Sequence, residues 1–287
     1  MKWQRARKSR NVEDRRGRRV AKAGGGLGLV GIAIVVVVSL ALGKNPMEML
    51  GLVNQVTGLT GSGSTQSAPP PGDDEASQFV ASILGETEDV WTALFQQSGQ
   101  RYQPPRLVLY TDRVSSACGT ASSAVGPFYC PGDQQIYIDL GFFEQMQMRL
   151  GGGGDFAEAY VIAHEVGHHI QNLTGVLRQV NEARARGQDI EGDGGLAVRQ
   201  ELQADCFSGV WAHHAQARHA WLEPGDIEEA LNTAAAIGDD RLQRQARGTV
   251  VPDSFTHGTS EQRVRWFRIG FESGEYQRCD TFAAARL

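Results

Sequence analysis

An uncharged run of 21 residues near the N-terminus sets the first limit on how this chain is organised: AGGGLGLVGIAIVVVVSLALG occupies positions 23–43. A helix of that length, rising about 1.5 Å per residue, crosses a bilayer core of about 30 Å. Residues 1–22 contain ten Lys or Arg and two acidic residues, a net charge of +8, whereas Lys44 stands alone beyond the run. Because basic residues favour the cytoplasmic side, the pattern predicts one transmembrane helix, with a basic cytoplasmic tail at 1–22 and an extracytoplasmic remainder.

Two other interpretations of this N-terminal region stay open. A cleaved signal peptide is compatible with the small residues around Ala41, and Arg15-Arg16 could belong to a twin-arginine export signal. The apolar run is longer than the usual core of a signal peptide, which favours an anchor over cleavage. We therefore expect a single-pass protein of the cell membrane.

The chain between the predicted span and the folded domain is expected to be a stalk and linker, over residues 44–74. Residues 44–59 (KNPMEMLGLVNQVTGL) are mildly apolar and fit either a short helix at the membrane surface or a poorly structured stalk. Residues 61–74 (GSGSTQSAPPPGDD) are rich in Gly, Ser and Pro and lack large apolar groups, so a flexible tether is expected. The folded domain is then predicted to span residues 75–287.

The charge of the body of the chain limits its partners. Residues 23–287 contain 18 basic and 31 acidic residues, a net charge of −13. A nucleic-acid-binding face needs Lys and Arg to displace phosphate counterions, so nucleic acid is excluded as a partner of this domain. The basic tail is expected to attract anionic lipids instead. The sequence sets no limit on the oligomeric state.

Residues 75–287 are typical of an α+β domain in which helices predominate. Apolar side chains at helical spacing predict an amphipathic helix over 75–97, and β-branched residues bounded by Pro and Gly predict strands over 106–111 and 135–139. Further helices are predicted over 155–173, 196–217, 226–237 and 260–271. Asp155 with Glu158, and Thr259 with Gln262, have the spacing of helix-capping pairs. Because strands come early and helices later, we expect a small sheet beside a mainly helical body.

The four cysteines suit an oxidising compartment. Cys118 and Cys130 lie close in sequence, with Gly, Ser and Pro between them, and could join a loop, which would leave Cys206 and Cys279 as a second pair. Four cysteines allow three connectivities, and the sequence alone does not select one. Because no CxxC motif occurs, a cysteine-based zinc site is disfavoured.

The helix predicted over 155–173 contains the motif His164-Glu165-Val166-Gly167-His168. Residues four apart lie on one face of a helix, so both imidazoles can point at a single ion. Neutral imidazole suits Zn²⁺, and the Glu between the histidines can reach a water on that ion. Gly167 destabilises a helix by about 1 kcal/mol relative to Ala, so its presence indicates a close approach of another segment.

A catalytic zinc site of this kind needs a third protein ligand and keeps its fourth position open. The helix predicted over 196–217 offers Glu201, with Asp205 one turn further along. Glu201 can complete the ligand set with His164 and His168. Asp205 can accept a hydrogen bond from the non-coordinating nitrogen of a ligand histidine and so fix its tautomer. The alternative for both carboxylates is an ordinary solvated helix face.

The other histidines carry weaker predictions. His257 lies in a Gly-containing loop before a capped helix and could stabilise an oxyanion in the transition state; the alternative is an ordinary loop histidine. His169 points about 100° away from the ligand face. Tyr137 and Asp139 belong to a predicted strand that could border a cleft. Surface positions are expected for the histidines late in the helix over 196–217, which are His213, His214 and His219.

Taken together, these motifs resemble a bacterial family of membrane-anchored neutral zinc metallopeptidases. The resemblance extends over most of the chain and rests on the segments Asn11–Gly17, Phe128–Pro131, His164–Gln171, Glu201–Asp205, Phe255–Arg263 and Cys279–Phe282. The two histidines, the glutamate and the trailing aspartate also resemble the thermolysin-like zincin group. The resemblance implies a zincin-like fold, one zinc ion per chain and peptide or protein substrates.

Two hypotheses of function follow. In the first, the chain is a membrane-anchored metallopeptidase that hydrolyses peptide bonds by zinc-activated water, with Glu165 as general base and with the zinc, helped by His257, stabilising the oxyanion. In the second, the domain binds zinc but serves as a membrane-tethered interaction module without proteolytic activity. The presence of Glu165 favours the enzyme, because a purely structural zinc needs no base beside it.

Overall fold

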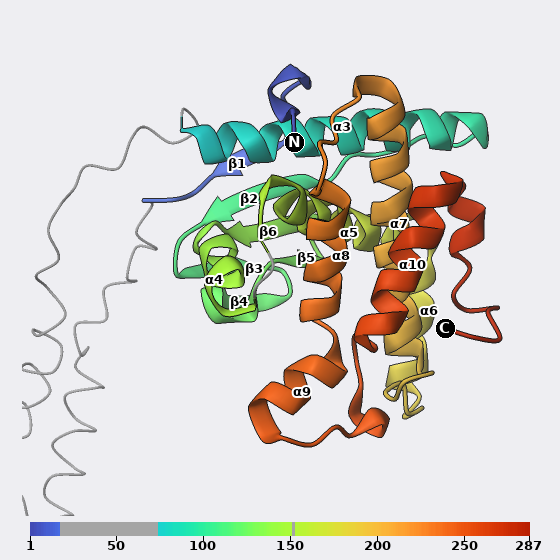
Figure 1. Ribbon diagram of the computed structural model, residues 1–287. Helices are drawn as coiled ribbons and strands as arrows, with labels where there is room; N and C mark the ends of the chain where they lie inside the picture. Colours follow the sequence, from blue (N-terminus) through green and yellow to red (C-terminus); the bar gives the residue numbers. More distant parts are fainter. Residues whose placement is uncertain (18–73, 151–152) are drawn as a thin grey trace, which may run out of the picture. The chain divides into compact units, whose positions relative to one another are not determined.

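The structure is a computed structural model that describes residues 1–17, 74–150 and 153–287. Met1–Arg16 and the residues from Asp74 onward belong to one compact unit, in which a small sheet lies beside a larger helical body (Figure 1). The predicted α+β class, mainly helical with a small sheet, is confirmed for this unit.

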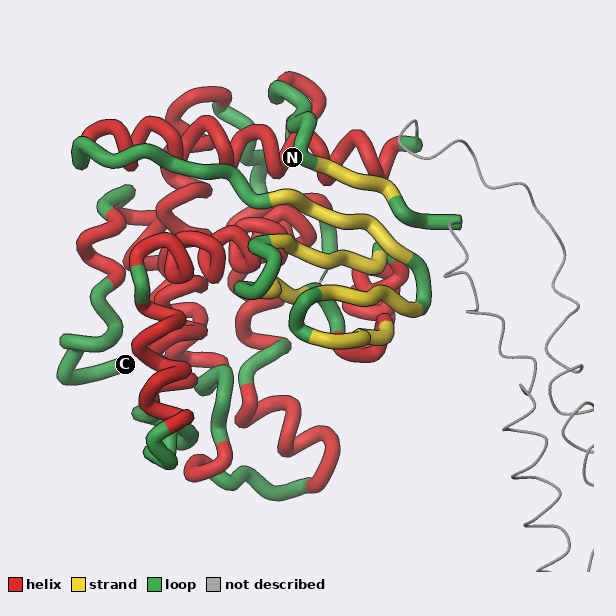
Figure 2. The backbone as a smooth tube through the Cα atoms, turned by 180° about the vertical axis from the view of Figure 1, so that it is seen from behind, coloured by secondary structure: helices red, strands yellow, loops and turns green. Residues whose placement is uncertain are grey.

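The main sheet of the described residues has four strands in the order β1–β2–β6–β5, seen side by side in Figure 2. Three of them run parallel: β1 (Val12–Asp14), β2 (Arg106–Tyr110) and β6 (Gln135–Asp139). The fourth, β5 (Phe128–Cys130), runs antiparallel to β6 and ends the sheet. A separate hairpin pairs β3 (Arg113–Ser116) with β4 (Gly119–Ser122).

Both faces of the central strands are buried, which accounts for their apolar sequence. On one face Leu107 and Ile138 belong to the main core that the sheet shares with the helices. On the other face Val108 and Tyr137 pack with Val114 of the hairpin in a smaller cluster. The sheet therefore lies between the hairpin and the helical body.

Five longer helices make up most of the helical body: α3 (Glu75–Gln97), α5 (Asp155–Thr174), α7 (Leu196–His219), α8 (Asp226–Ala236) and α10 (Ser260–Ser273). Their shared core is rich in aromatic side chains, such as Trp91, Trp211 and Phe267, each 1% exposed or less. Three shorter helices that the sequence did not predict lie between them: α4 (Gly141–Leu150), α6 (Val176–Ala185) and α9 (Asp239–Arg247).

The helix-capping predictions have different outcomes. Thr259 and Gln262 form a capping box at the start of α10, as predicted. At the start of α5, however, the N-cap residue is Gly154 and no side chain caps the helix, so the predicted Asp155–Glu158 pair is wrong. Asp155 lies inside the first turn, where its charge still favours the helix N-terminus.

Close packing of α7 on α10 fixes the helix that carries the predicted ligand Glu201. A Cβ atom added to Gly270 would lie 2.0 Å from the Cys206 carbonyl oxygen, and one added to Gly209 would lie 2.1 Å from that of Phe267. The two backbones therefore approach as closely as only glycine permits. The disulfide Cys206–Cys279 joins α7 to the segment after α10.

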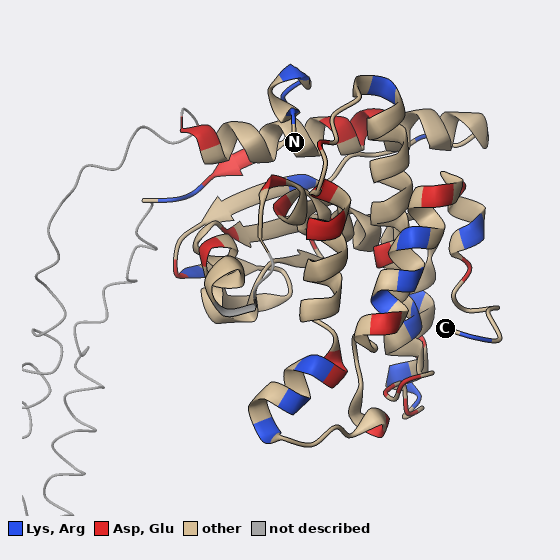
Figure 3. Cartoon of the chain, viewed as in Figure 1, with Lys and Arg blue, Asp and Glu red and all other residues tan. Residues whose placement is uncertain are grey.

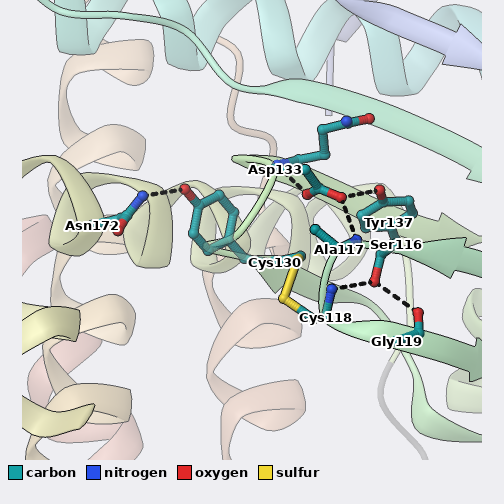
Figure 4. The surroundings of a disulfide bond; sticks show 10 residues. Ser116, Ala117, Cys118, Gly119, Cys130, Asp133, Tyr137 and Asn172 are labelled. Atoms are coloured by element: carbon teal, nitrogen blue, oxygen red, sulfur yellow. Dashed lines mark hydrogen bonds between the residues drawn. A yellow bond between two sulfur atoms is a disulfide. The ribbon is translucent and has the colours of Figure 1, made fainter. Parts of the chain in front are cut away.

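The second disulfide, Cys118–Cys130, joins the turn of the β3–β4 hairpin to the end of β5, and Figure 4 shows its surroundings. The sequence analysis considered the pairs Cys118–Cys130 and Cys206–Cys279 first, and the structure confirms this pairing. Asp133 supports the same corner, because its carboxylate accepts hydrogen bonds from the Tyr137 hydroxyl and the Ala117 N–H. The end of β5 and the turn after it are thus attached to the hairpin and to β6.

The predicted boundary between a tail at 1–22 and a domain at 75–287 differs from the structure. Met1–Arg16 belong to the same compact unit as the helices, and β1 within this segment pairs with β2. No helix among the described residues is long and apolar enough to cross a bilayer. The span predicted at 23–43 and nearly all of the stalk and linker predicted at 44–74 lie outside the described residues.

Candidate metal centre

The two motif histidines lie one turn apart on α5 and face α7. Their ring centroids are 4.8 Å apart, and His164 is only 7% exposed. The helix can come this close to α7 because of Gly167: a Cβ atom there would lie 3.0 Å from the Ala204 Cα atom. The close approach that the sequence indicated at Gly167 is therefore present.

Glu201 lies directly across this contact and points at both imidazoles. Its carboxylate oxygens are 3.2 Å from Nε2 of His164 and 3.5 Å from Nε2 of His168. One ligand atom from each of the three residues lies within 4.8 Å of the others. Ligand atoms about 2.0–2.1 Å from a tetrahedral zinc ion are about 3.3 Å apart, so the spacing suits such an ion.

The other nitrogen of each imidazole is already occupied by a hydrogen bond. His164 donates from Nδ1 to the Asp205 carboxylate over 2.8 Å, and His168 donates from Nδ1 to the Gln171 side-chain oxygen over 2.9 Å. Because Nδ1 of each ring is engaged in this way, Nε2 is the nitrogen that each histidine directs toward Glu201 and would offer to a metal. Asp205 lies where the sequence predicted it. The role of Gln171 was not predicted, although it is three residues after His168 on the same helix.

Asp205 is itself the centre of a buried polar network. It is 0% exposed, and Arg263 from α10 donates to both of its oxygens over 2.8 Å. The Tyr160 hydroxyl donates to it over 2.5 Å. Burial alone would raise the pKa of Asp205, but the Arg263 guanidinium and His164 hold that pKa well below its usual range. The aspartate is therefore ionised and fixed when it orients His164.

The motif glutamate, Glu165, is buried and lines a cavity together with the two histidines. It is 7% exposed, and its Oε2 atom has no hydrogen-bond partner among the described residues. Burial raises the pKa of its carboxyl group. A buried carboxylate oxygen without a partner is unfavourable unless a water or ligand normally completes it. The donor set and this orphaned oxygen together fit a zinc ion with a water beside it.

A cavity of about 470 Å³ opens over these groups. His164, Glu165, His168 and Glu201 line it on one side. Its other walls are largely apolar and come from the edge strand β5, the segment before it, α4, α6 and α9; they include Val125, Phe128, Tyr129, Phe142, Leu177 and Leu242. The site is thus a cleft with a few polar groups in an apolar surround, as binding sites usually are.

His257 lines the same cavity, with its side chain 52% exposed. Its loop is anchored by Asp239, whose Oδ2 atom accepts the backbone N–H groups of Thr256, His257 and Gly258. Asp239 Oδ1 lies 3.4 Å from the imidazole Nδ1. The structure therefore brings His257 to the cleft, with its Nε2 directed away from Asp239. The sequence did not predict the supporting role of Asp239.

His169 is fully buried and belongs to a different network. The Tyr129 hydroxyl, which accepts from Asn172, lies 3.0 Å from its Nδ1, and its Nε2 donates to the Gln103 carbonyl oxygen over 2.6 Å. Burial lowers the pKa of His169 to about 4, so the ring is neutral. This network, part of which Figure 4 shows, joins α5 to β5 and so holds the edge strand beside the metal-binding face.

The remaining candidates lie elsewhere. Tyr137 stacks on Phe128 and Asp139 accepts backbone N–H groups after its strand; neither residue lines the cavity. The histidines late in α7 are only partly exposed and make hydrogen bonds to Phe271, Gly274 and Glu86 respectively: His213, His214 and His219.

Replacing Gly167 by Ala is expected to weaken metal binding. The added Cβ would press on Ala204, so α7 would have to shift by a few tenths of an ångström and carry Glu201 with it. We expect the zinc dissociation constant to rise about tenfold, as for other changes that displace a ligand slightly. Competition with a chromophoric chelator measures it, and Gly194→Ala, where a Cβ meets open space, is the matched control. Equal affinity in both variants would contradict the role given to this contact.

Comparisons with known proteins agree with the geometry. The model of the family described as "Putative neutral zinc metallopeptidase" matches residues 1–282. The uncharacterized protein YpfJ of Escherichia coli K12 is 48% identical over 98% of this chain and 99% of its own length. The uncharacterized protein Rv2575 of Mycobacterium tuberculosis H37Rv is 44% identical over 74% of each chain. No solved structure matches. The chain therefore belongs to the neutral zinc metallopeptidase family.

Proposed function

We propose that this protein is a zinc-dependent peptidase that hydrolyses peptide bonds in the cleft above α5. One observation carries the proposal: two imidazole Nε2 atoms and the Glu201 carboxylate converge within 4.8 Å, beside a buried glutamate oxygen that has no partner among the described residues. A structural zinc site is closed by protein ligands and needs no such base. The proposed fold of the domain is zincin-like.

In this proposal His164, His168 and Glu201 would hold the zinc ion, which when bound acts as a Lewis acid and lowers the pKa of a water to about 7. Glu165 takes the proton of the attacking water and passes it to the leaving amine. Asp205 and Gln171 keep both imidazoles in the required tautomer.

His257 would stabilise the oxyanion that forms on the substrate carbonyl. Its position on the cleft wall supports this role, and the hydrogen bonds of Asp239 to its loop hold it there. The imidazole Nδ1 faces Asp239 and the Thr256 hydroxyl, so Nε2 is the atom that would face a substrate. Half of the side chain is exposed, so a bound substrate can reach it.

The edge strand β5 would bind the substrate backbone. This strand lies at the edge of the sheet. Its residues Phe128 and Tyr129, and Pro131 directly after it, line the cleft. An extended peptide can pair with such an edge through main-chain hydrogen bonds. The apolar walls of the cavity then favour substrates with apolar side chains near the scissile bond.

Removal of the metal tests the proposal. The full-length protein is incubated with a mixed peptide library, and cleavage is followed by mass spectrometry before and after treatment with a zinc chelator. We expect chelation to abolish cleavage and added Zn²⁺ to restore it. Cleavage that persists after chelation would refute zinc-dependent hydrolysis. Firmly bound zinc without cleavage of any peptide would favour the alternative, a zinc-binding interaction module.

A further inference from the structure

The N-terminal segment Met1–Arg16 is built into the unit that carries the metal centre. Its strand β1 pairs with β2 in register from Val12 to Asp14, and Leu107 N–H donates to the Asn11 carbonyl oxygen over 2.8 Å. Trp3 is 5% exposed and packs edge-on against Phe79 of α3. Figure 1 shows the segment crossing α3 before it joins the sheet.

A buried carboxylate of α3 depends on this segment. Glu88 is 5% exposed and accepts hydrogen bonds from Ser9 over 2.5 Å, from Asn11 over 2.7 Å and from Arg7 over 2.7 Å. All three donors come from the N-terminal segment. Without it, a buried charge would lose three partners, which is strongly unfavourable. The acidic stretch of α3 that receives the segment is visible in Figure 3.

The sequence of α3 is also adapted to the segment. A Cβ atom added to Gly85 would lie 2.1 Å from the Arg7 carbonyl oxygen. A glycine within a helix destabilises it by about 1 kcal/mol relative to Ala, and this close crossing explains its presence. A glycine at position 85 is therefore needed for the N-terminal backbone to cross α3 this closely.

We infer that Met1–Arg16 and the metal-bearing domain lie on the same side of any membrane to which the protein is attached. A single crossing by residues 23–43 would place the two parts on opposite sides, and would remove β1 from the sheet and all three donors from Glu88. The two disulfides indicate that the shared side is extracytoplasmic. This inference does not depend on the proposed peptidase activity.

The structure also explains why the basic tail is a poor guide to topology here. Arg7 is paired with Glu88 and Asp89 of α3, and Arg16 with Asp14 and Asp74. These arginines are neutralised within the folded unit. They therefore add less to the positive-inside signal than a count of basic residues suggests.

Accessibility of single cysteines tests the inference. All four native cysteines are in disulfides, so Arg10→Cys and Arg247→Cys, both at exposed positions, each add one free thiol to the full-length chain. We expect a membrane-impermeant maleimide to label both equally in intact spheroplasts. Labelling of position 247 alone before permeabilisation would overturn the inference. Labelling of both only after permeabilisation would overturn the extracytoplasmic assignment.

Hydrogen exchange tests the docking itself. In Gly85→Ala the added methyl group must displace the Arg7 backbone, so amides of residues 9–15 are expected to exchange at least about tenfold faster than in the wild type. Gly194→Ala, with open space around its Cβ, is the matched control and should exchange like the wild type. If residues 9–15 of Gly85→Ala exchanged as slowly as in the wild type, the close contact between the Arg7 backbone and α3 would be wrong.

Discussion

Replacing Glu165 by Gln is expected to reduce peptide hydrolysis by about 10²–10⁴-fold while zinc stays bound, because a general base contributes about that much to the rate. The amide keeps the shape of the side chain but cannot take the proton of the attacking water. Since Glu165 is not among the three groups that face the metal, the metal content should not change. Initial rates on a peptide cleaved by the wild type, together with elemental analysis, measure both effects.

A matched control for this variant lies on the same helix. Glu158→Gln also changes a carboxyl group of α5 whose pKa burial raises, to about 7, but Glu158 does not line the cleft. It should leave the rate within about twofold of the wild type, as expected of a change outside the site. If Glu165→Gln retained full activity with zinc bound, the assignment of the base would be wrong. If it also lost the zinc, its effect would not be that of a base.

Replacing Arg263 by Met is expected to destabilise the protein by about 3–5 kcal/mol, because it leaves a buried carboxylate without its cation. Arg263 is 2% exposed and binds both oxygens of Asp205, which is 0% exposed. Asp205 would then lose its fixed position, and its hydrogen bond to His164 would weaken. The free energy of unfolding in denaturant and the zinc dissociation constant should therefore both change.

Two further arginine variants separate charge from geometry. Arg263→Lys keeps the charge but not the planar fork that binds two oxygens, so an intermediate loss is expected. Arg268→Met removes an exposed arginine from the same helix and should change stability by less than about 0.5 kcal/mol. An Arg263→Met variant as stable as Arg268→Met would show that the buried network does not support the site.

The ligand residues could be predicted from the sequence because the decisive relations are local. His164 and His168 are one helical turn apart, as are Glu201 and Asp205, and the helical period brings each pair to one face. Gly167 even indicated where the two helices approach. The partner helix followed because α7 is the next long helix in the chain.

The supporting residues could not be predicted, because they reach the site from distant parts of the chain. Arg263 lies 58 residues from Asp205, and their contact depends on the packing of α10 on α7. Asp239, at the start of α9, anchors His257 although nothing near either residue indicates a pair. The short helix α9 was missed because only Leu242 and Ala246 of its residues are apolar, which leaves little apolar stripe to detect. In α6 the apolar residues Leu177, Val180 and Ala183 do have helical spacing, so this helix could have been predicted from the sequence.

The N-terminal segment was also mispredicted because its partners are distant in the sequence. Its basic composition predicted a separate tail, since the positive-inside rule considers only charge beside an apolar run. In the structure Arg7 is held by acidic side chains more than 70 residues away, and Trp3 is part of the core. Composition describes how a segment would behave alone, whereas this segment does not act alone.

Zinc content measured on the full-length protein, purified without chelators, tests the central claim most directly. We expect one zinc ion per chain in the wild type and almost none in Glu201→Ala, which removes one of the three converging ligands. Glu191→Ala changes an exposed glutamate of a neighbouring loop and should retain the zinc. A wild type without zinc, or a Glu201→Ala variant that binds zinc as fully as Glu191→Ala, would contradict the account.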